Sequence, residues 1–361
     1  MKSTIERLRT DRRLPWGGTA PRPRGGVGRR ELLAGAGSVL LLGAVGCTGT
    51  SEEGGDAAAP GRRIEHKYGS VEITDRPARV VTVGLTEQDY VLALGGTLVG
   101  VREWFGGHEG ALWPWAREVL GDAPLPEVLP VEELNFERIA ALEPDLILGV
   151  NSGLTQEEYD LLSNVAPTVA QPGDYPDYGA PWQDIARIVG RALDREAEAE
   201  ALVADIEERF EQARTEHPEF DGATGLLATF IDEAAFVYAE GPAPGFLTQL
   251  GFELPQAAAE LFTDENRAPV EVSLERLEVL DSDVLLVGLY GDGQRLAERP
   301  VVRDLDVARE GRMLTMPEMS GVNGALSFGS VLSLPFALDE LVPRIADLAD
   351  GDAETEPAAV E

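Results

Sequence analysis

The chain has 361 residues, 43% of them hydrophobic, and a formal net charge of −34 at pH 7. This length is too great for one small domain and suits two domains with cores of their own. The negative charge argues against a nucleic-acid-binding protein, because phosphates would be repelled. The single cysteine, Cys47, excludes an internal disulfide and disfavours a zinc–thiolate site. We therefore expect a fold that depends on its hydrophobic cores.

The first 46 residues have the pattern of an export signal. A region with eight arginines precedes an apolar run over residues 32–45. The run is shorter than the roughly 20 residues of a transmembrane helix, and this order of basic and apolar regions is typical of a signal peptide. The pair Arg29-Arg30 resembles a twin-arginine export signal. Removing residues 1–46, which hold nine basic and three acidic residues, lowers the formal charge to about −40.

The segment that follows predicts a membrane anchor. Ala44-Val45-Gly46-Cys47 resembles a lipobox, although Ala44 replaces the usual leucine. A buried small hydrophobe is the alternative role for Cys47. The polar residues after it have almost nothing to bury, so residues 47–62 are predicted to be a flexible tether. We expect an extracytoplasmic protein, lipid-anchored at Cys47 to the cell membrane.

The first half of the remaining chain alternates strands and helices. Residues 79–83 and 98–101 are predicted strands, with a helix over 88–94 that ends at Gly95-Gly96. Residues 146–150 form an apolar run that is typical of a parallel strand buried on both faces. This alternation predicts an α/β lobe over residues 63–193.

A long helix is predicted next. Asp194 can cap a run over residues 195–216 that has no Gly or Pro, and Pro218 stops it. Its predicted apolar stripe comprises Ala197, Ala201, Leu202, Ile206, Phe210 and Ala213. At 1.5 Å per residue the helix is about 33 Å long, enough to bridge two lobes. The alternative is an ordinary surface helix of one domain.

The second half repeats the first. Residues 225–231 and 284–289 are predicted strands, with a helix over 245–250. Residues 135–148 match 273–286 in their order of cap, apolar residue, Glu, Arg and apolar run. This duplication predicts two similar Rossmann-like lobes joined by a single long backbone helix, with a ligand cleft between the lobes. The helix occupies residues 194–217, the second lobe 218–349, and an acidic disordered tail 350–361.

The ordered motifs resemble one family, the helix-backboned solute-binding proteins of ABC importers for ferric siderophores, haem and cobalamin. The motifs are Arg76-Pro77-Ala78-Arg79-Val80-Val81, Leu92-Ala93-Leu94-Gly95, Val99-Gly100-Val101, Asn135-Phe136-Glu137-Arg138-Ile139-Ala140-Ala141-Leu142-Glu143-Pro144-Asp145-Leu146-Ile147 and Ala166-Pro167-Thr168. The resemblance covers roughly residues 63–348. It implies a monomeric receptor that captures a ferric siderophore and delivers it to a membrane permease with its ATPase. The only iron would be that of the siderophore, and no other cofactor is implied.

The resemblance also implies that Glu137 and Glu275, one in each lobe, dock on arginines of the permease. Two carboxylates at equivalent places on duplicated lobes present matched charges to a symmetric partner. The alternative is that each Glu only favours the N-terminus of its own helix, an effect of about 0.3–1 kcal/mol.

The predicted ligand residues follow from the carboxyl ends of the strands, where open α/β sheets bind ligands. Trp104 and Phe105 offer flat apolar surface, and Arg102 and Arg267 offer charge for acidic oxygens. The predicted set comprises Leu85, Thr86, Arg102, Trp104, Phe105, Asn151, Tyr238, Arg267, Tyr290, Met319 and Asn323. Trp113 and Trp115 could line the cleft mouth or anchor a surface loop.

Other readings stay open. Ferric-hydroxamate members of the family carry an arginine where Val131 stands, and aromatic residues at the places of Arg267 and Asn323, so a hydroxamate ligand is not secured. His66, His108 and His217 are isolated, which disfavours a metal site. The alternative functions are a binding protein for cobalamin or haem, or a cleft enzyme or sensor on the same scaffold. The enzyme is disfavoured because no nucleophile elbow, P-loop or complete Gly-x-Gly-x-x-Gly motif occurs.

Overall fold

The computed structural model describes residues 61–263, 268–350 and 360. The predicted signal peptide, Cys47, Arg267, and most of the tether and the acidic tail lie outside these residues. The described part begins with a hairpin that sequence reasoning missed, formed by β1 (Arg62–His66) and β2 (Gly69–Ile73). β1 begins at Arg62, the last residue of the predicted tether.

The first lobe is built on a parallel five-stranded sheet. The strand order is β5-β4-β3-β6-β7. Its elements are β3 (Val80–Thr82), α2 (Glu87–Ala93), β4 (Leu98–Arg102), η1 (Glu109–Ala111), α3 (Pro114–Leu120), β5 (Glu127–Leu129), α4 (Phe136–Ala141), β6 (Leu146–Gly149), α5 (Gln156–Ser163), β7 (Thr168–Ala170) and α6 (Trp182–Ala192). β3 and β6 are buried throughout, as their continuous apolar runs predict. The predicted strands and the helix over 88–94 are confirmed to within one residue at each end.

The second lobe repeats this plan with one difference. The strand order is β10-β9-β8-β11-β12; β8, β11 and β12 are parallel, and β9 runs antiparallel to both of its neighbours, β8 and β10. Its elements are η2 (Pro218–Phe220), β8 (Gly225–Ile231), β9 (Ala234–Val237), α8 (Pro242–Gln249), α9 (Gln256–Ala259), β10 (Val270–Val272), η3 (Leu274–Leu280), β11 (Val284–Tyr290), α10 (Gly293–Ala297), α11 (Pro300–Arg303), α12 (Asp306–Arg309), β12 (Met313–Pro317), α13 (Gly321–Phe328) and α14 (Ser333–Ala349). The predicted α/β fold with two lobes is confirmed.

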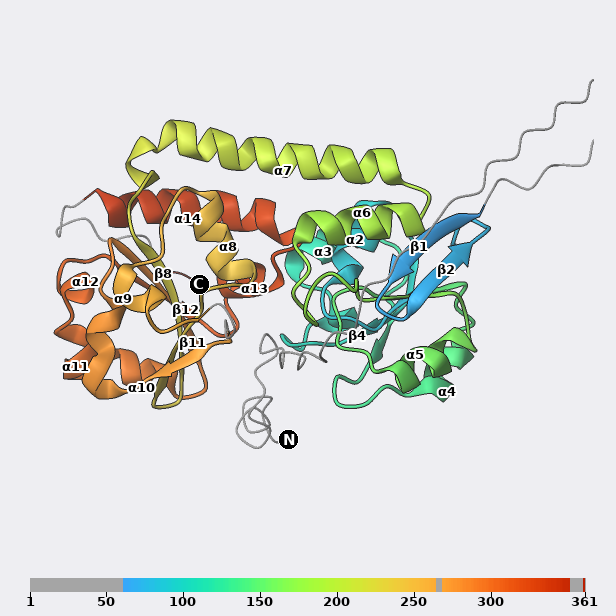
Figure 1. Cartoon of the computed structure of the whole chain (residues 1–361), viewed down its shortest axis with the longest axis horizontal. Coiled ribbons are helices and arrows are strands. Elements are labelled where there is room, and N and C mark those ends of the chain that lie inside the picture. Colours follow the sequence, from blue (N-terminus) through green and yellow to red (C-terminus); the bar gives the residue numbers. More distant parts are fainter. Residues whose placement is uncertain (1–60, 264–267, 351–359, 361) are drawn as a thin grey trace, which may run out of the picture.

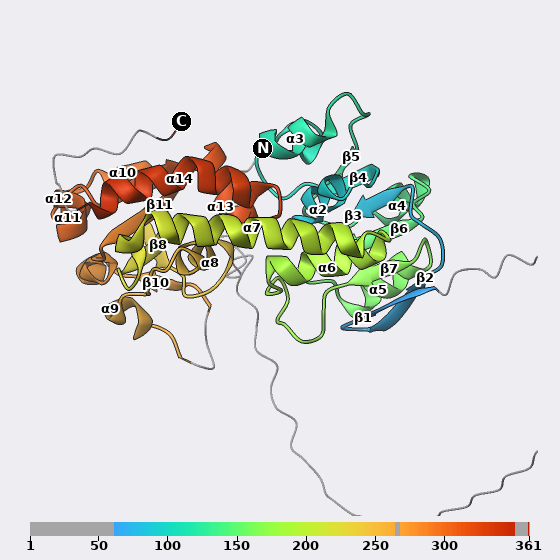
Figure 2. The same cartoon turned by 90° about the horizontal axis from the view of Figure 1, so that it is seen from above.

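The long helix α7 (Glu196–Glu216) runs across both lobes, as Figures 1 and 2 show. It packs on α6 of the first lobe and α14 of the second. Its N-cap is Arg195; Asp194, predicted to cap it, has φ of +59° and lies in the preceding turn, a conformation that Asp tolerates better than most residues. The buried stripe is Ala199, Val203, Ile206, Phe210 and Ala213, so Ala197 and Ala201 were placed wrongly and are exposed.

The internal repeat is confirmed as a helix that leads into a buried strand in each lobe, but the two copies differ. Asn135 caps α4 by accepting a hydrogen bond from the Arg138 amide at 2.9 Å. Ser273 stands at the N-cap of η3 without a side-chain capping bond, and η3 is a 3₁₀ helix kinked at Arg276. The duplicated sequence pattern therefore fixes the position of each helix but not its type.

The two lobes share one hydrophobic core beneath α7. Trp113 and Trp115 of the first lobe are buried and stacked, with ring centroids 5.2 Å apart and planes 6° apart. Both contact Phe328 of the second lobe, at 6.0 and 5.8 Å. Sequence reasoning offered a cleft mouth or the anchoring of a surface loop for these tryptophans, and did not foresee their burial between the lobes. They are interior residues that join the lobes.

The packing at this junction predicts a stability effect at Gly324 of α13. A Cβ atom there would lie 2.4 Å from Cζ3 of Trp113, whose ring is buried and cannot move aside. We expect Gly324→Ala to lower the free energy of unfolding by about 1–3 kcal/mol in urea denaturation, the usual cost of overpacking. Gly245→Ala in α8 is the control, because no atom outside its own helix lies within 4 Å of the added methyl group. Equal stability of the two variants would contradict the expectation.

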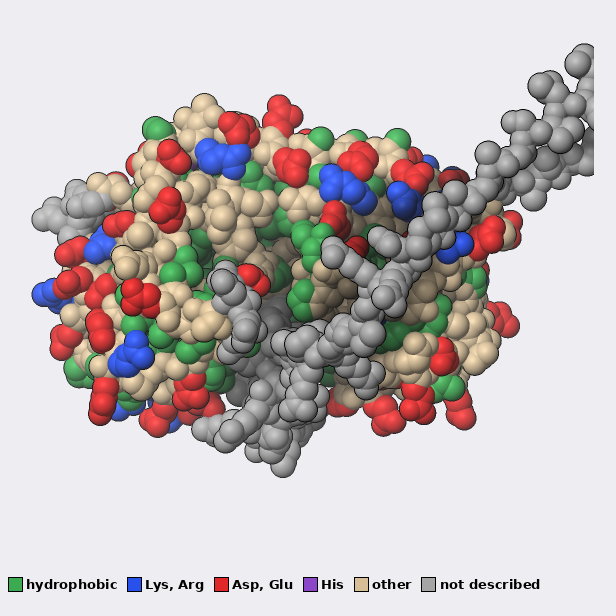
Figure 3. All heavy atoms as spheres, in the orientation of Figure 1, with side chains coloured by type: hydrophobic (Ala, Val, Ile, Leu, Met, Phe, Trp, Pro, Cys, Tyr) green, Lys and Arg blue, Asp and Glu red, His purple; other side chains and the backbone are tan. Residues whose placement is uncertain are grey.

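Figure 3 shows acidic side chains scattered over both lobes and basic side chains singly or in small groups. In the described residues, no helix combines the length and apolar character needed to cross a membrane.

Candidate functional site

The first-lobe sheet reverses its strand order between β3 and β6, and the loops after these strands meet there. The Leu85 amide donates to the Asn151 carbonyl at 3.1 Å, and Asn151 Nδ2 donates to Thr86 Oγ1 at 3.0 Å. Such a switch point is where open α/β sheets bind ligands. The structure therefore brings together Leu85, Thr86 and Asn151. Leu85 and Thr86 are buried, and Asn151 is half-buried.

Glu87, which sequence reasoning missed, fixes this switch point from inside. Its buried carboxylate accepts hydrogen bonds from the Asn151 amide at 2.7 Å and the Thr86 amide at 3.1 Å. Burial raises the pKa of Glu87, and the amide hydrogen bonds oppose that shift. The sequence signal was an acid in the first turn of a helix directly after a strand end.

Arg102 lies beside the switch point. Its guanidinium donates to the Val83 carbonyl at 3.2 Å and to the Val131 carbonyl at 2.5 Å. Arg102 thereby ties the loop after β3 to the loop after β5 and places a cation at that corner. Tyr178, missed in the sequence, lies within reach of the Arg102 charge. Burial raises the pKa of Tyr178, and the Arg102 charge opposes the rise.

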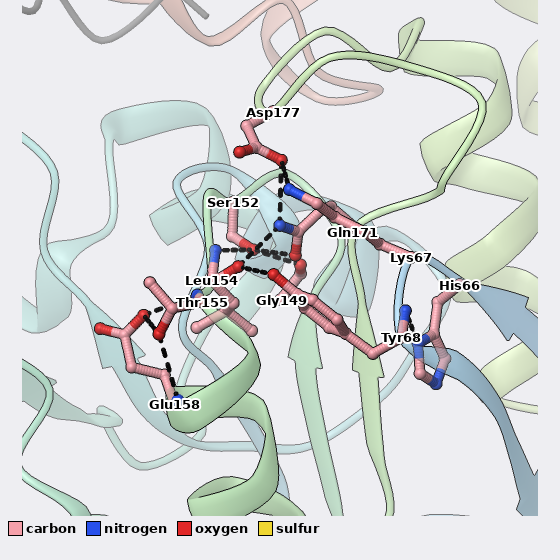
Figure 4. Close-up of polar contacts among 10 residues, drawn as sticks. All are labelled: His66, Lys67, Tyr68, Gly149, Ser152, Leu154, Thr155, Glu158, Gln171 and Asp177. Carbon is pink, nitrogen blue, oxygen red and sulfur yellow. Dashed lines mark hydrogen bonds and ion pairs between the residues drawn. The ribbon is translucent and has the colours of Figure 1, made fainter. Parts of the chain in front are cut away.

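A polar network joins Lys67, Ser152, Leu154, Gln171 and Asp177 next to these loops, as Figure 4 shows. Gln171 Nε2 donates to the Asp177 carboxylate and to the Leu154 carbonyl, each at 3.0 Å. Ser152 Oγ donates to Gln171 Oε1 at 3.2 Å, and Lys67 pairs with Asp177 at 2.6 Å. The β1–β2 hairpin thereby supports the site through Lys67. We call Leu85, Thr86, Arg102, Asn151 and Tyr178 the first-lobe edge.

The aromatic pair Trp104 and Phe105 lies where the two lobes meet. Their ring centroids are 4.6 Å apart in an edge-to-face arrangement. Both rings also contact Phe328 of α13, at 5.2 Å from Trp104 and 5.8 Å from Phe105. The pair is half-buried, so it connects the shared core to the carboxyl ends of the first-lobe strands.

The second lobe gathers its own polar group at the matching switch point, between β8 and β11. The Tyr290 hydroxyl donates to Asn323 Oδ1 at 3.3 Å and lies 3.4 Å from Ser327 Oγ. The hydroxyls of Tyr238 and Thr229 are 2.8 Å apart. Burial raises the pKa of both tyrosines. We call Thr229, Tyr238, Tyr290, Asn323 and Ser327 the second-lobe group.

Gly288 explains how this group converges. A Cβ atom at Gly288 would lie 3.0 Å from Asn323 Oδ1, 3.1 Å from Cε2 of Tyr290 and 3.5 Å from Cγ2 of Thr229. Only a residue without a side chain leaves these three groups in contact. Met319, also predicted, is 54% exposed and makes no recorded contact with the group. The predicted Arg267 lies outside the described residues.

The predicted docking residues make no hydrogen bond or ion pair with either group. Glu137 and Glu275 are exposed in the first turns of α4 and η3. Arg138, next to Glu137, is ion-paired with Glu127 of β5. Arg276, next to Glu275, has no recorded partner within the described residues. The arginine next to Glu137 is therefore ion-paired, and among the described residues the arginine next to Glu275 is not.

Metal ligation finds no support in the described residues, where no group of three or more His, Cys, Asp and Glu side chains could hold an ion. His108 packs against Trp113 with ring centroids 4.4 Å apart and planes tilted by 58°, and burial lowers its pKa. His66 accepts a hydrogen bond from the Tyr68 amide at 3.2 Å, and burial lowers its pKa as well. Both side chains are packed parts of the first lobe.

Comparison with known proteins identifies the family of this chain. The model of a family described as periplasmic binding protein matches residues 80–319. The chain belongs to the periplasmic binding protein family. A crystal structure of a periplasmic solute binding protein from Mycobacterium smegmatis is 35% identical with a TM-score of 0.72, and the match covers 80% of this chain and 99% of that one.

Two further relatives carry more specific names. The probable siderophore-binding lipoprotein YfiY of Bacillus subtilis (strain 168) is 27% identical over 260 residues, 70% of this chain and 76% of the relative. The crystal structure of the iron uptake ABC transporter substrate-binding protein PiaA from Streptococcus pneumoniae TIGR4 is 25% identical with a TM-score of 0.64. That match covers 80% of this binding protein and 99% of PiaA.

Proposed function

We propose that this protein is the substrate-binding lipoprotein of an ABC importer. It captures a ferric siderophore outside the cell and delivers the complex to a membrane permease with its ATPase. The observation that carries the proposal is the contact of Trp104 and Phe105, which follow Arg102 of the first-lobe edge, with Phe328, which follows Ser327 of the second-lobe group. The names of YfiY and PiaA support the same ligand class.

The chemistry of the site suits a ligand that brings its own iron donors. A ferric siderophore presents oxygen atoms and flat or apolar surface, so its receptor needs donors and aromatics rather than a metal cage. Arg102 uses two of its five N–H donors on carbonyls in recorded bonds, and its Nε atom is buried without a partner. This guanidinium would meet the oxygens of the complex. Tyr178, Tyr290 and Asn323 would supply neutral hydrogen bonds.

A binding role also fits the acidic residues better than catalysis does. An acid/base pair would need Glu137 and Glu275 beside the ligand. They stand instead on the exposed first turns of α4 and η3 and make no hydrogen bond or ion pair with the first-lobe edge or the second-lobe group. We propose that they dock the two lobes on the permease, and that the lipid on Cys47 keeps a monomeric receptor close to it.

Fluorescence titration tests the ligand class. Of the four tryptophans after the leader, Trp104 lies beside the proposed site, so a bound ferric complex should quench its emission. We expect saturable quenching at submicromolar concentration by a ferric siderophore of the hydroxamate, catecholate or carboxylate class. Trp104→Phe should reduce the quenching amplitude, while Trp182→Phe, in α6, serves as the control. No quenching by any of the three siderophore classes, together with quenching by haem or cobalamin, would overturn the proposal.

A further inference from the structure

A buried carboxyl group joins the two lobes outside the candidate ligand site. Asp89 of α2 is 1% exposed. Its Oδ2 accepts hydrogen bonds from Trp115 Nε1 at 2.8 Å and from the Ser330 hydroxyl of the second lobe. Its Oδ1 is buried and has no hydrogen-bond partner. Two segments 241 positions apart in the chain are therefore joined by one side chain.

On the second-lobe side this bond reaches the corner between α13 and α14. Ser330 and Ser333 exchange hydrogen bonds, from the Ser330 amide to Ser333 Oγ at 2.8 Å and from the Ser333 amide to Ser330 Oγ at 3.1 Å. Ser333 Oγ also donates to the Ala325 carbonyl at 2.9 Å. Asp89 thus holds the helix corner that carries Phe328.

On the first-lobe side the same carboxyl group orients an aromatic chain. Trp115 stacks on Trp113, and the Trp113 ring lies 5.2 Å from Phe105 in an edge-to-face contact. Phe105 packs on Trp104 beside the candidate site. Each ring is fixed by the next, so a shift at Asp89 would be felt at the aromatic pair.

No cation compensates the Asp89 charge among the described residues. On its own helix the neighbours are the buried acid Glu87 and Tyr90, whose pKa is raised by burial and by both acidic charges. The charged side chains of the packed helices point to the surface or bond elsewhere: Arg117 and Glu118 on α3, Asp184, Arg187 and Arg191 on α6, and Asp339, Glu340, Arg344 and Asp347 on α14. Burial raises the pKa of Asp89 to about 7.

We propose that Asp89 is a proton-dependent latch, whose neutral carboxyl group holds the α13–α14 corner against the first lobe and whose ionisation weakens that contact. An ionised Asp89 would be a buried charge with two hydrogen bonds, a bare Oδ1 and no counter-ion, which is an unfavourable state. The folded protein binds this proton more tightly than the unfolded chain does. Stability is therefore lost as the pH rises from the ordinary pKa of 3.8 towards about 7, and the loss is complete above that.

The test compares wild type with Asp89→Asn, which keeps the shape and an acceptor oxygen but never ionises. Urea unfolding is measured between about pH 5 and pH 8. Relative to the variant, the wild-type folding constant should fall up to tenfold per pH unit below about pH 7. Asp339→Asn, an exposed change on α14, is the control and should follow wild type. Glu87 remains in both proteins, so its titration cancels in the comparison.

The NMR signal of the Trp115 indole N–H gives a second readout that needs no variant. In wild type it should shift with a midpoint near pH 7, and in Asp89→Asn it should stay constant. Parallel stability profiles, or an indole signal that does not move in wild type between pH 5 and pH 8, would overturn the latch.

The consequence for ligand binding rests on the proposed function. Affinity should fall above about pH 7 in wild type and not in Asp89→Asn. A protein that binds none of the ferric complexes at any pH would contradict the proposed function, while the stability and NMR results would still decide the latch.

Discussion

Replacing both Glu137 and Glu275 by lysine is expected to abolish uptake of the ligand while leaving its affinity for the binding protein unchanged. Both side chains are exposed and make no hydrogen bond or ion pair with the first-lobe edge or the second-lobe group. Reversal turns attraction to arginines of a permease into repulsion at two points, which costs several kcal/mol. The fold should survive, because each change removes at most a helix N-terminal effect of about 0.3–1 kcal/mol.

The measurement is uptake of radiolabelled iron complex by cells that carry the variant as their only copy, with affinity measured on the purified protein. The control is the pair Glu133→Lys and Glu278→Lys, which changes the charge equally in the same two regions of the surface. Normal uptake in the Glu137/Glu275 variant would refute the docking role. Lost uptake in the control would show that net charge alone is responsible.

Arg102→Gln is expected to weaken binding of the ferric complex by about 10- to 100-fold. A hydrogen bond to a charged group contributes about 1.5–3 kcal/mol, and 1.4 kcal/mol corresponds to a factor of ten in affinity. Glutamine retains one N–H group for the Val83 or Val131 carbonyl, so the loop should keep its shape. Affinity is measured by titration of tryptophan fluorescence.

Arg117→Gln is the matched control. Arg117 also donates to a backbone carbonyl, that of Gly121 at 2.8 Å, but it is exposed on α3. Its variant should bind the ligand normally. Equal affinities for both variants would remove Arg102 from the site and leave the neutral hydroxyl and amide groups as the recognition elements.

The elements of the fold could be predicted because their signals are local. β6 and β11 are continuous apolar runs, and such runs are buried wherever the sheet places them. The ends of helices were predicted less accurately, because capping depends on the backbone conformation of one residue. Asp194 is a good cap in isolation, yet the turn after α6 needs a left-handed residue at that position.

The site could be predicted only where it follows from the ends of strands. Thr86, Asn151 and Tyr290 directly follow or end parallel strands, and the structure places them at the two switch points. Tyr178 comes from a long loop after β7 and reaches Arg102 only through the fold. The burial of Trp113 and Trp115 between the lobes could not be predicted, because it depends on Phe328, more than 200 positions later in the chain.

The shared core also has a consequence for how the protein is made. Trp113 and Trp115 belong to the first lobe, but the residues that bury them lie on α13 and in α14, the last helices of the chain. When the ribosome has completed the first lobe, Trp113 and Trp115 still lack the second-lobe side chains that bury them. The amino-terminal lobe therefore cannot complete its core before the carboxyl-terminal helices are made. Until then the emerging chain exposes aromatic surface that is prone to aggregation.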